Sequence, residues 1–203
     1  MRGTLFAFDG PDHVGKTTQA QMLVNQISCT GSPCELMRFP DRSTPIGELL
    51  NQYMTSQVET EPRVISLLFA ANRHEHAARI LEKLRGGTHV VLDRSSYSGI
   101  AYAMSLGLPM PYCESLEAGL PKPDVVFNLG EPHTKKRPDW GSERYDTLGA
   151  QIRVRIAFGA LFEEHRDVVV DVASDGPIEQ VAWTVAEHAS CRLAIDTDVV
   201  LFQ

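Results

Sequence analysis

The chain alternates between short runs of apolar residues and longer stretches in which apolar positions recur every three to four residues. Short runs rich in Val, Leu and Phe, with few polar positions between them, are typical of parallel strands buried on both faces. The longer stretches have the spacing of helices that bury one face. Strands are predicted at residues 4–8, 35–39, 89–92, 124–129 and 168–172, and helices at 16–27, 46–53, 63–84, 97–105, 151–164 and 177–189, the last with Pro177 at its first position.

Strands that alternate with helices in this way are typical of an α/β fold, here a five-stranded parallel sheet flanked by helices on both faces. The 203 residues suffice for one such unit with a sizeable core, so residues 1–203 are expected to form a single domain. Two segments, 106–123 and 131–146, are punctuated by Pro and Gly and are predicted to be loops. The second is charged and is expected to act as a lid that excludes water from bound reactants.

The composition is that of a soluble globular protein, because no apolar run approaches the roughly 20 residues that a membrane span needs. The formal net charge is −7, so no general binding of nucleic acid through a basic surface is expected. The chain opens on an apolar strand pattern without a secretory leader, and its four cysteines form no C-x-x-C pair. We therefore expect reduced thiols and a cytoplasmic location, with another reducing compartment as the alternative.

Residues 10–17 read GPDHVGKT and match the pattern G-x-x-x-x-G-K-[ST] between a predicted strand and a predicted helix. This is a P-loop, whose backbone N–H groups and helix N-terminus bind nucleotide phosphates, and the expected fold is that of the P-loop NTPases. Lys16 is expected to reach the β and γ oxygens of ATP, and Thr17 to bind Mg²⁺. The other residues of the predicted ATP-binding set are Gly10, His13, Gly15 and Thr18.

A P-loop serves switches, motors and kinases alike, so other residues must indicate the reaction. Asp93 is expected to organise Mg²⁺ at the end of a central strand, and Arg94 to face the transferred phosphoryl group. A kinase needs further positive charge around its two phosphate groups, and Arg42 is placed to hold the acceptor phosphate. The charged loop adds Lys135, Lys136, Arg137 and Arg144, and a solvated run of charges is the alternative interpretation of residues 135–137.

Six separated segments resemble the thymidylate kinase family, and its eukaryotic and poxviral type more than its bacterial type. They are FDGPDHVGKTTQ at 8–19, FPDRST at 39–44, LLFAANR at 67–73, Asp93-Arg94 with Ser98, Gly99 and Tyr102, LPKPD at 120–124 and GSERY at 141–145. The resemblance implies a nucleoside monophosphate kinase that transfers the γ-phosphoryl group of MgATP to dTMP, giving dTDP and ADP. It also implies a homodimer.

The resemblance further implies roles for single residues around the acceptor. Phe69 matches an aromatic ring that stacks on thymine, although a helix core residue is the alternative, and Arg73 matches an arginine at the thymine carbonyl edge. Tyr102 matches a tyrosine packed on the deoxyribose, where its ring would exclude a 2′-hydroxyl. The other residues expected to bind dTMP are Asp12, Phe39, Arg42, Arg94, Ser98, Gly99, Tyr145 and Gln151. Arg144 is expected to bind the ATP phosphates. The residues expected to act in catalysis are Asp12, Lys16, Arg94 and Arg137. The Phe39–Pro40 bond resembles one that is cis in the family.

Three positions depart from the family pattern. His13 stands where the eukaryotic type commonly has arginine, Ser95 where tyrosine follows Asp-Arg, and His74 where tryptophan follows Ala-Asn-Arg. We expect the lid, and Arg137 in particular, to compensate for His13, and the other two changes to enlarge the acceptor pocket. The alternatives that stay open are a kinase that accepts both dTMP and dUMP, a deoxynucleoside kinase, and a nucleotide-dependent switch.

Overall fold

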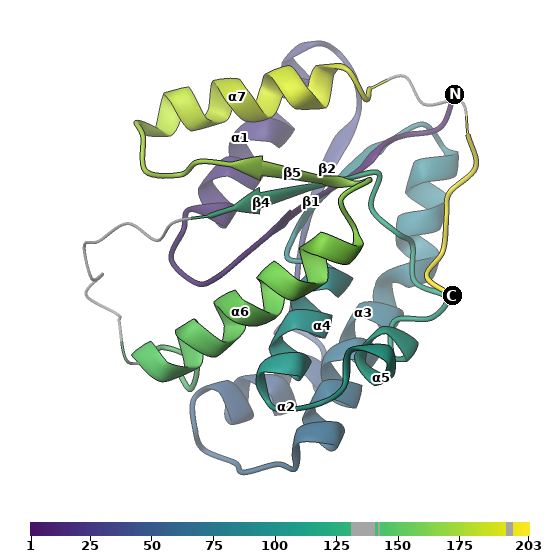
Figure 1. The fold of residues 1–203 in the computed structure, drawn as a ribbon. Helices are drawn as coiled ribbons and strands as arrows, with labels where there is room; N and C mark the ends of the chain where they lie inside the picture. The colour runs from purple at the N-terminus through teal and green to yellow at the C-terminus, as the bar shows by residue number, and fades with distance from the viewer. Residues whose placement is uncertain (131–140, 142, 194–196) are drawn as a thin grey trace.

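The computed structural model describes residues 1–130, 141, 143–193 and 197–203, and within them a five-stranded parallel sheet forms the centre of the fold (Figure 1). The predicted α/β fold is confirmed, and each predicted strand lies within one residue of the observed one at both ends. The Phe39–Pro40 peptide bond after the second strand is cis, as the resemblance implied. The strands are β1 (Leu5–Asp9), β2 (Cys34–Arg38), β3 (His89–Asp93), β4 (Val125–Leu129) and β5 (Val169–Val172), in the spatial order β2-β3-β1-β4-β5.

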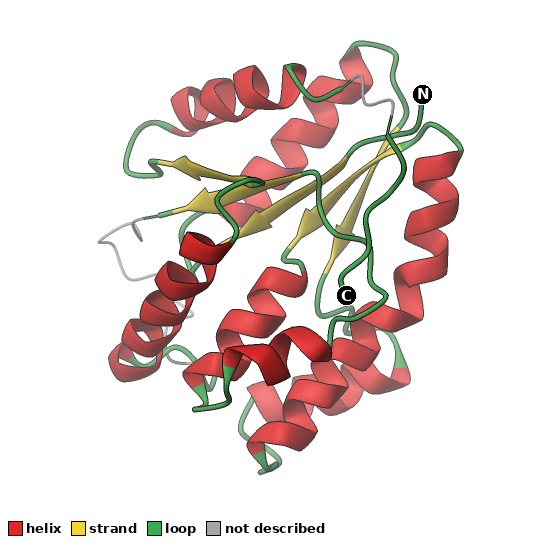
Figure 2. Ribbon diagram, turned by 45° about the vertical axis from the view of Figure 1, so that its right-hand side comes forward, coloured by secondary structure: helices red, strands yellow, loops and turns green. Residues whose placement is uncertain are grey.

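Helices cover both faces of the sheet (Figure 1, Figure 2). The helices α1 (Lys16–Cys29) and α7 (Ile178–Ser190) pack together on one face. The other face carries α3 (Pro62–Arg85), α4 (Ser96–Ser105) and α6 (Leu148–Glu164), with α2 (Pro45–Met54) against α3 and α5 (Met110–Ser115) against α4. Among the described helices, none has both the length and the apolar character that crossing a bilayer requires.

The helices differ from the prediction in several places, and α5, α6 and α7 show the part that the first turn plays. The sequence predicts only a loop at 106–123, yet α5 forms there, because prolines are tolerated in the first turn of a helix. Helix α6 begins three residues before its predicted start, at Leu148, since the side chain of Thr147 caps it by accepting a hydrogen bond from the N–H of Ala150. Pro177 is the N-cap of α7 and not its first helical residue.

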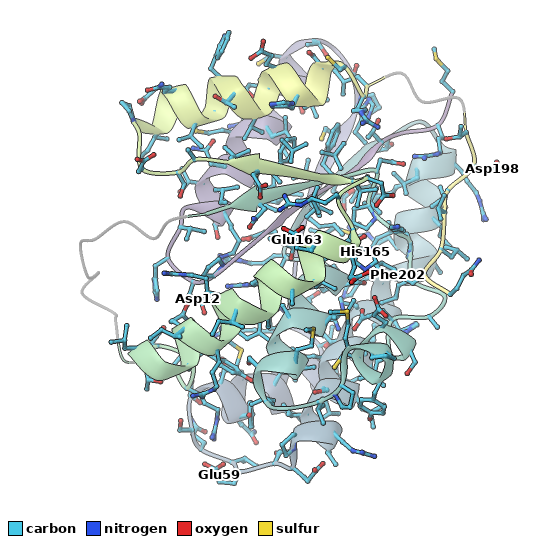
Figure 3. The ribbon with its side chains drawn as sticks, in the orientation of Figure 1. Asp12, Glu59, Glu163, His165, Asp198 and Phe202 are labelled. Carbon is cyan, nitrogen blue, oxygen red and sulfur yellow. The ribbon has the colours of Figure 1, made fainter. Side chains whose placement is uncertain are left out.

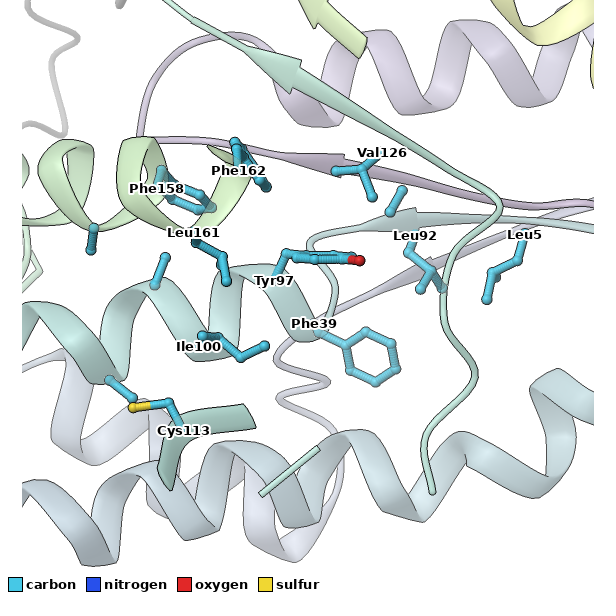
Figure 4. Close-up of a cluster of buried hydrophobic side chains, with 14 of the residues drawn as sticks. Leu5, Phe39, Leu92, Tyr97, Ile100, Cys113, Val126, Phe158, Leu161 and Phe162 are labelled. Atoms are coloured by element: carbon cyan, nitrogen blue, oxygen red, sulfur yellow. The ribbon is translucent and has the colours of Figure 1, made fainter. Parts of the chain in front are cut away.

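The side chains of the central strands alternate between two hydrophobic cores. Along β1, Leu5 and Ala7 pack toward α3, α4 and α6, whereas Phe6 and Phe8 pack toward α1 and α7. Figure 4 shows the first core, where Tyr97 lies between the sheet and the helices with its hydroxyl among apolar side chains. Because both faces of the sheet are buried, its strands are held rigidly and their carboxyl ends can support a site.

The C-terminal segment packs on the body of the protein and pairs with it. The sequence left three possibilities for this segment, which were an edge strand, packing on the body and a loose end. The N–H of Phe202 donates to the carbonyl oxygen of Leu120 at 2.9 Å, and an antiparallel bridge joins Pro121 and Leu201. The ring of Phe202 contacts Tyr97 edge-on, with 5.5 Å between ring centroids. Packing on the body is therefore realised, whereas the pairing is an isolated bridge and the segment does not join the sheet as an edge strand.

Candidate active site

A cavity of about 570 Å³ opens where β1, β2 and β3 end, the edge at which parallel sheets of this type bind ligands. The P-loop, the ends of β2 and β3, one side of α3 and α4, and the segment 143–146 form its walls. Fifteen of the predicted site residues line it: Asp12, His13, Gly15, Lys16, Thr17, Phe39, Arg42, Phe69, Arg73, Asp93, Arg94, Ser98, Gly99, Tyr102 and Tyr145. The fold thus brings residues from widely separated parts of the chain to one place.

The P-loop connects β1 to α1 through three residues with positive φ. Gly10, His13 and Gly15 have φ angles of 128°, 64° and 94°. A side chain at Gly10 would lie 2.6 Å from a backbone oxygen of β4, so this position requires glycine. The ammonium group of Lys16 is buried and donates to the carbonyl oxygen of Pro11, which closes the loop around the lysine. The loop therefore has the compact form that binds phosphate through backbone N–H groups.

Arg94 and Asp12 form an ion pair across the cavity, and Asp12 is the centre of a network. Its carboxylate also accepts hydrogen bonds from the hydroxyl of Tyr102, at 2.6 Å, and from the side-chain amide of Gln151, at 2.9 Å. Burial alone would raise the pKa of Asp12, but the positive charges of Arg94 and Lys16 outweigh burial and hold the pKa well below its usual range. Asp12 is therefore an ionised group that orients its neighbours.

Arg94 has a φ of 73°, a backbone conformation that is uncommon for residues other than glycine. Such strained residues cluster at functional sites, where the surrounding structure holds them in place. The guanidinium of Arg94 lies over the ring of Tyr102, 5.2 Å from its centroid. The strain and this contact together direct the guanidinium into the cavity.

Lys16 is protonated less readily than an ordinary lysine. Burial, followed by the positive charge of Arg94, lowers the pKa of Lys16 to about 7. The negative oxygens of a nucleotide would favour the protonated form, so bound phosphate would raise this pKa. Phosphate binding therefore increases the positive charge carried by Lys16 near neutral pH.

Thr17 and Asp93, the two predicted metal ligands, lie side by side. The hydroxyl of Thr17 donates to the carboxylate of Asp93 at 2.7 Å. Arg38 is not among the predicted site residues, yet its guanidinium lies 2.9 Å from the same carboxylate and 2.6 Å from the same hydroxyl. In the register of β2 and β3, Arg38 is the direct neighbour of Asp93, so knowledge of the strand order would have revealed it.

The opposite wall of the cavity carries the predicted base-binding residues. Phe69 is half-buried on α3, and Arg73 follows one helical turn later on the same face. The guanidinium of Arg73 is held by the buried carboxylate of Glu117, a residue that sequence reasoning missed because it comes from the loop after α5. The ring of Tyr102 completes this wall. One flat ring, one guanidinium and one phenol thus surround a single slot.

Two side-chain contacts link the segment 143–146 to Arg42 and to His13. Arg42 donates to the side-chain oxygen of Asn51 at 2.9 Å and to the carboxylate of Glu143 at 2.7 Å. The ring nitrogen Nε2 of His13 lies 3.0 Å from the carboxylate of Asp146. The P-loop histidine thereby contacts the last residue of the predicted lid.

Four predicted site residues do not line the cavity. Gly10 and Gln151 support it from behind, and Thr18 is exposed in the first turn of α1. The guanidinium of Arg144 is bound to Glu59 at 2.8 Å, which disagrees with the phosphate contact predicted for Arg144. Figure 3 shows Glu59 far from Asp12. The predicted lid residues Lys135, Lys136 and Arg137 lie outside the described residues.

The two departures near the acceptor pocket differ in their placement. Ser95 lines the cavity, where its hydroxyl donates to the buried carboxylate of Asp9 at 2.5 Å. His74 is exposed, and its ring lies 3.3 Å from the carbonyl oxygen of Leu116, outside the cavity. Only the change at position 95 therefore affects the cavity wall, and the expectation that His74 also enlarges the pocket disagrees with the structure.

Comparison with known proteins identifies the family. Residues 8–184 match the family model described as thymidylate kinase. A thymidylate kinase of Dictyostelium discoideum is 43% identical over 157 residues, which are 76% of this chain and 71% of that protein. The chain belongs to the thymidylate kinase family. The human thymidylate kinase is 38% identical over 166 residues, covering 80% of this chain and 78% of its own.

The similarity extends to the three-dimensional fold. The structure of the thymidylate kinase of Candida albicans matches with a TM-score of 0.84 and 32% identity, covering 100% of this chain and 99% of that one. Its description refers to the origin of a broad substrate specificity in that enzyme. The resemblance inferred from six short segments is confirmed, as are the P-loop kinase fold and the prediction of an enzyme.

Proposed function

We propose that this protein transfers the γ-phosphoryl group of ATP to dTMP, producing ADP and dTDP. The observation that carries this proposal is that one cavity has a P-loop on one wall and the slot formed by Phe69, Arg73 and Tyr102 on the other. Arg94 and Asp12 lie between these two walls. Membership of the thymidylate kinase family supports the same substrates.

The arrangement supports a direct transfer without a covalent enzyme intermediate. An oxygen of the acceptor phosphate forms a bond to the γ-phosphorus, and the bond from that phosphorus to the bridging oxygen breaks, which leaves ADP. Lys16 and Arg94 stabilise the negative charge on the transferred group. No general base is needed, because a phosphate monoester is already ionised near neutral pH.

Asp12 has a positioning role in this reaction. Its low pKa keeps it ionised at neutral pH, and its three partners, Arg94, Tyr102 and Gln151, occupy the carboxylate. Arg94 is thereby fixed between the donor and acceptor phosphates. Tyr102 is fixed against the acceptor sugar, where its bulk disfavours a ribonucleotide.

Mg²⁺ is proposed as the cofactor that accompanies ATP. The hydroxyl of Thr17 and the carboxylate of Asp93 are the hard oxygen ligands that this ion prefers. When bound, Mg²⁺ would neutralise charge on the β and γ oxygens of ATP. Because the guanidinium of Arg38 contacts both ligands, it must turn away for the ion to bind.

A broader deoxypyrimidine monophosphate kinase is the second candidate. The small side chain of Ser95 on the cavity wall favours it, because a tyrosine at this position, as the family pattern implies, would take up more of the pocket. A deoxynucleoside kinase is disfavoured, since it would need a free carboxylate base at the acceptor hydroxyl and Asp12 is already bound to Arg94.

We also propose that the protein forms a homodimer through α6. Leu148, Ile152 and Ile156 are 74%, 48% and 68% exposed and follow one another at four-residue intervals, so they form one apolar stripe along the helix. Leu67 of α3 and Leu49 of α2 add further exposed apolar surface. A second copy of the chain would remove this surface from water.

A coupled ADP-release assay with dTMP, dUMP, thymidine, dGMP and UMP as acceptors tests the proposed substrates. We expect the highest kcat/KM with dTMP, a measurable rate with dUMP, and no stimulation by thymidine. Preferred use of thymidine would establish the deoxynucleoside kinase instead. ATP hydrolysis that no acceptor stimulates would indicate a nucleotide-dependent switch.

A further inference from the structure

A fully buried ion pair lies behind the base slot. Arg73 and Glu117 are 6% and 1% exposed. The Nε of Arg73 donates to one carboxylate oxygen of Glu117 at 2.8 Å, and its Nη2 donates to the other oxygen. Such a bidentate contact fixes both the position and the plane of a guanidinium.

The guanidinium is also confined from the side of α4. A Cβ atom at Gly99 would lie 2.2 Å from Nη2 of Arg73 and 2.6 Å from its Cζ, so only glycine leaves room for the group there. Glu117 itself does not line the cavity, whereas Arg73 does. Among the described residues, Nη1 of Arg73 has no hydrogen-bond acceptor, so this donor is available to a ligand.

We propose that Glu117 is a positioning residue that sets the choice of acceptor base by holding Arg73 with its free donors toward the slot. This inference rests on the proposed function, in which Arg73 contacts the base of dTMP. A guanidinium has donors and no acceptor, so it matches the 4-carbonyl oxygen of thymine or uracil. It opposes the 4-amino group of cytosine, which is itself a donor.

The fixed geometry is what makes this choice selective. A long arginine side chain in a partly solvated slot could turn away from a cytosine and leave room for water. With its Nε and Nη2 held by Glu117 and Gly99 packed beside it, Arg73 cannot withdraw its donors. A wrong base then leaves buried polar groups unpaired, which discriminates more strongly than shape does.

A matched pair of variants separates positioning from simple stabilisation. Glu117→Gln removes the charge beside Arg73, while Asp124→Asn removes the charge from a similar two-pronged pair with Arg2, whose hydrogen bonds are 2.8 and 2.6 Å. Asp124 does not line the cavity. Both variants lose a buried or half-buried ion pair, but only the first disturbs the base slot.

The readouts are KM and kcat for dTMP, and the inhibition constant of dCMP against dTMP. For E117Q we expect KM for dTMP to rise about tenfold with kcat within about threefold of the wild type, because binding of the base is weakened equally in ground and transition states. The preference for dTMP over dCMP should fall at least about tenfold, and D124N should change neither quantity by more than about twofold. A folded E117Q with wild-type KM and wild-type preference overturns the proposal.

Two further variants complete the test. If E117Q does not fold, Glu117→Asp keeps the charge and shortens its reach, and an unchanged preference in E117D overturns the proposal. The double variant Arg73→Met/Glu117→Gln removes the pair without leaving a lone buried charge. If the double variant keeps the preference for dTMP over dCMP, Arg73 does not contact the base as proposed. If E117Q keeps this preference and the double variant loses it, Arg73 contacts the base but Glu117 does not position it.

Discussion

Replacement of Asp12 by Asn tests how the two halves of the cavity are held together. The carboxylate of Asp12 accepts hydrogen bonds from Arg94, Tyr102 and Gln151, and its charge balances Arg94. D12N keeps a similar shape and one acceptor oxygen, but it loses the charge. We therefore expect Arg94 to lose its fixed orientation while the cavity keeps its volume.

The contacts set the size of the effect. Hydrogen bonds to a charged group contribute roughly 1.5–3 kcal/mol each, and D12N weakens the bonds from Arg94 and from Tyr102. The bound phosphates offset part of the loss by balancing Arg94 themselves, so we assign about 3 kcal/mol to the transition state, or a decrease of roughly 100-fold in kcat. Tyr102→Phe removes one hydrogen-bond donor and no charge, and should lower kcat by less than about tenfold.

The pH dependence distinguishes positioning from proton transfer. Asp12 has a lowered pKa in the folded protein, so its stabilising contribution is complete above its unfolded pKa and is lost only as the pH falls through the folded value, far below neutrality. D12N removes a charge that raises the pKa of Lys16, so any limb of the rate profile that follows Lys16 should move to lower pH, and no limb should disappear between about pH 6 and about 9. A rate for D12N within about threefold of wild type, or loss of one limb of the profile in this range, would refute the positioning role.

Three further predictions follow from other parts of the structure. The pKa of Lys16 is about 7 and bound phosphate raises it, so nucleotide binding at neutral pH should take up a proton. Calorimetry in buffers of different ionisation enthalpy measures this uptake, and a binding heat that does not depend on the buffer would contradict it. Since Arg38 contacts the proposed metal ligand Asp93, the variant Arg38→Ala should bind Mn²⁺ more tightly than the wild type in the absence of nucleotide. Electron paramagnetic resonance measures the two affinities, and equal values would show that Arg38 does not compete with the metal. Ile156→Glu should give a monomer in light scattering, whereas the same change at Trp183 of α7, which is 65% exposed, should leave the dimer intact; a dimer in both variants would exclude α6 as the interface.

Features encoded locally were predictable from the sequence. The buried strands read as continuous apolar runs, and the P-loop has its signature between a strand and a helix, so both follow from neighbouring residues alone. Phe69 and Arg73 are one helical turn apart, and this spacing already places them on one face. The six short segments that resemble the family extended the prediction to the acceptor.

Features created by long-range packing were not predictable. Arg38 reaches the metal ligands only because β2 lies beside β3, and periodicity does not reveal strand order. Glu117 reaches Arg73 from a segment predicted to be a loop, where prolines concealed the short helix α5. Arg144 belongs to the charged loop in sequence, but its guanidinium packs over Tyr53, 4.2 Å from the ring centroid, and binds Glu59.

A single molecule that joins adenosine to thymidine through a chain of phosphates shows whether the donor and acceptor phosphates meet in one cavity. Such a compound would fill the P-loop and the slot beside Phe69 at once. We predict that it binds with one molecule per chain and inhibits competitively against both ATP and dTMP. Competition against ATP alone, with dTMP still binding to the inhibited protein, would show that the donor and acceptor phosphates do not meet in this cavity.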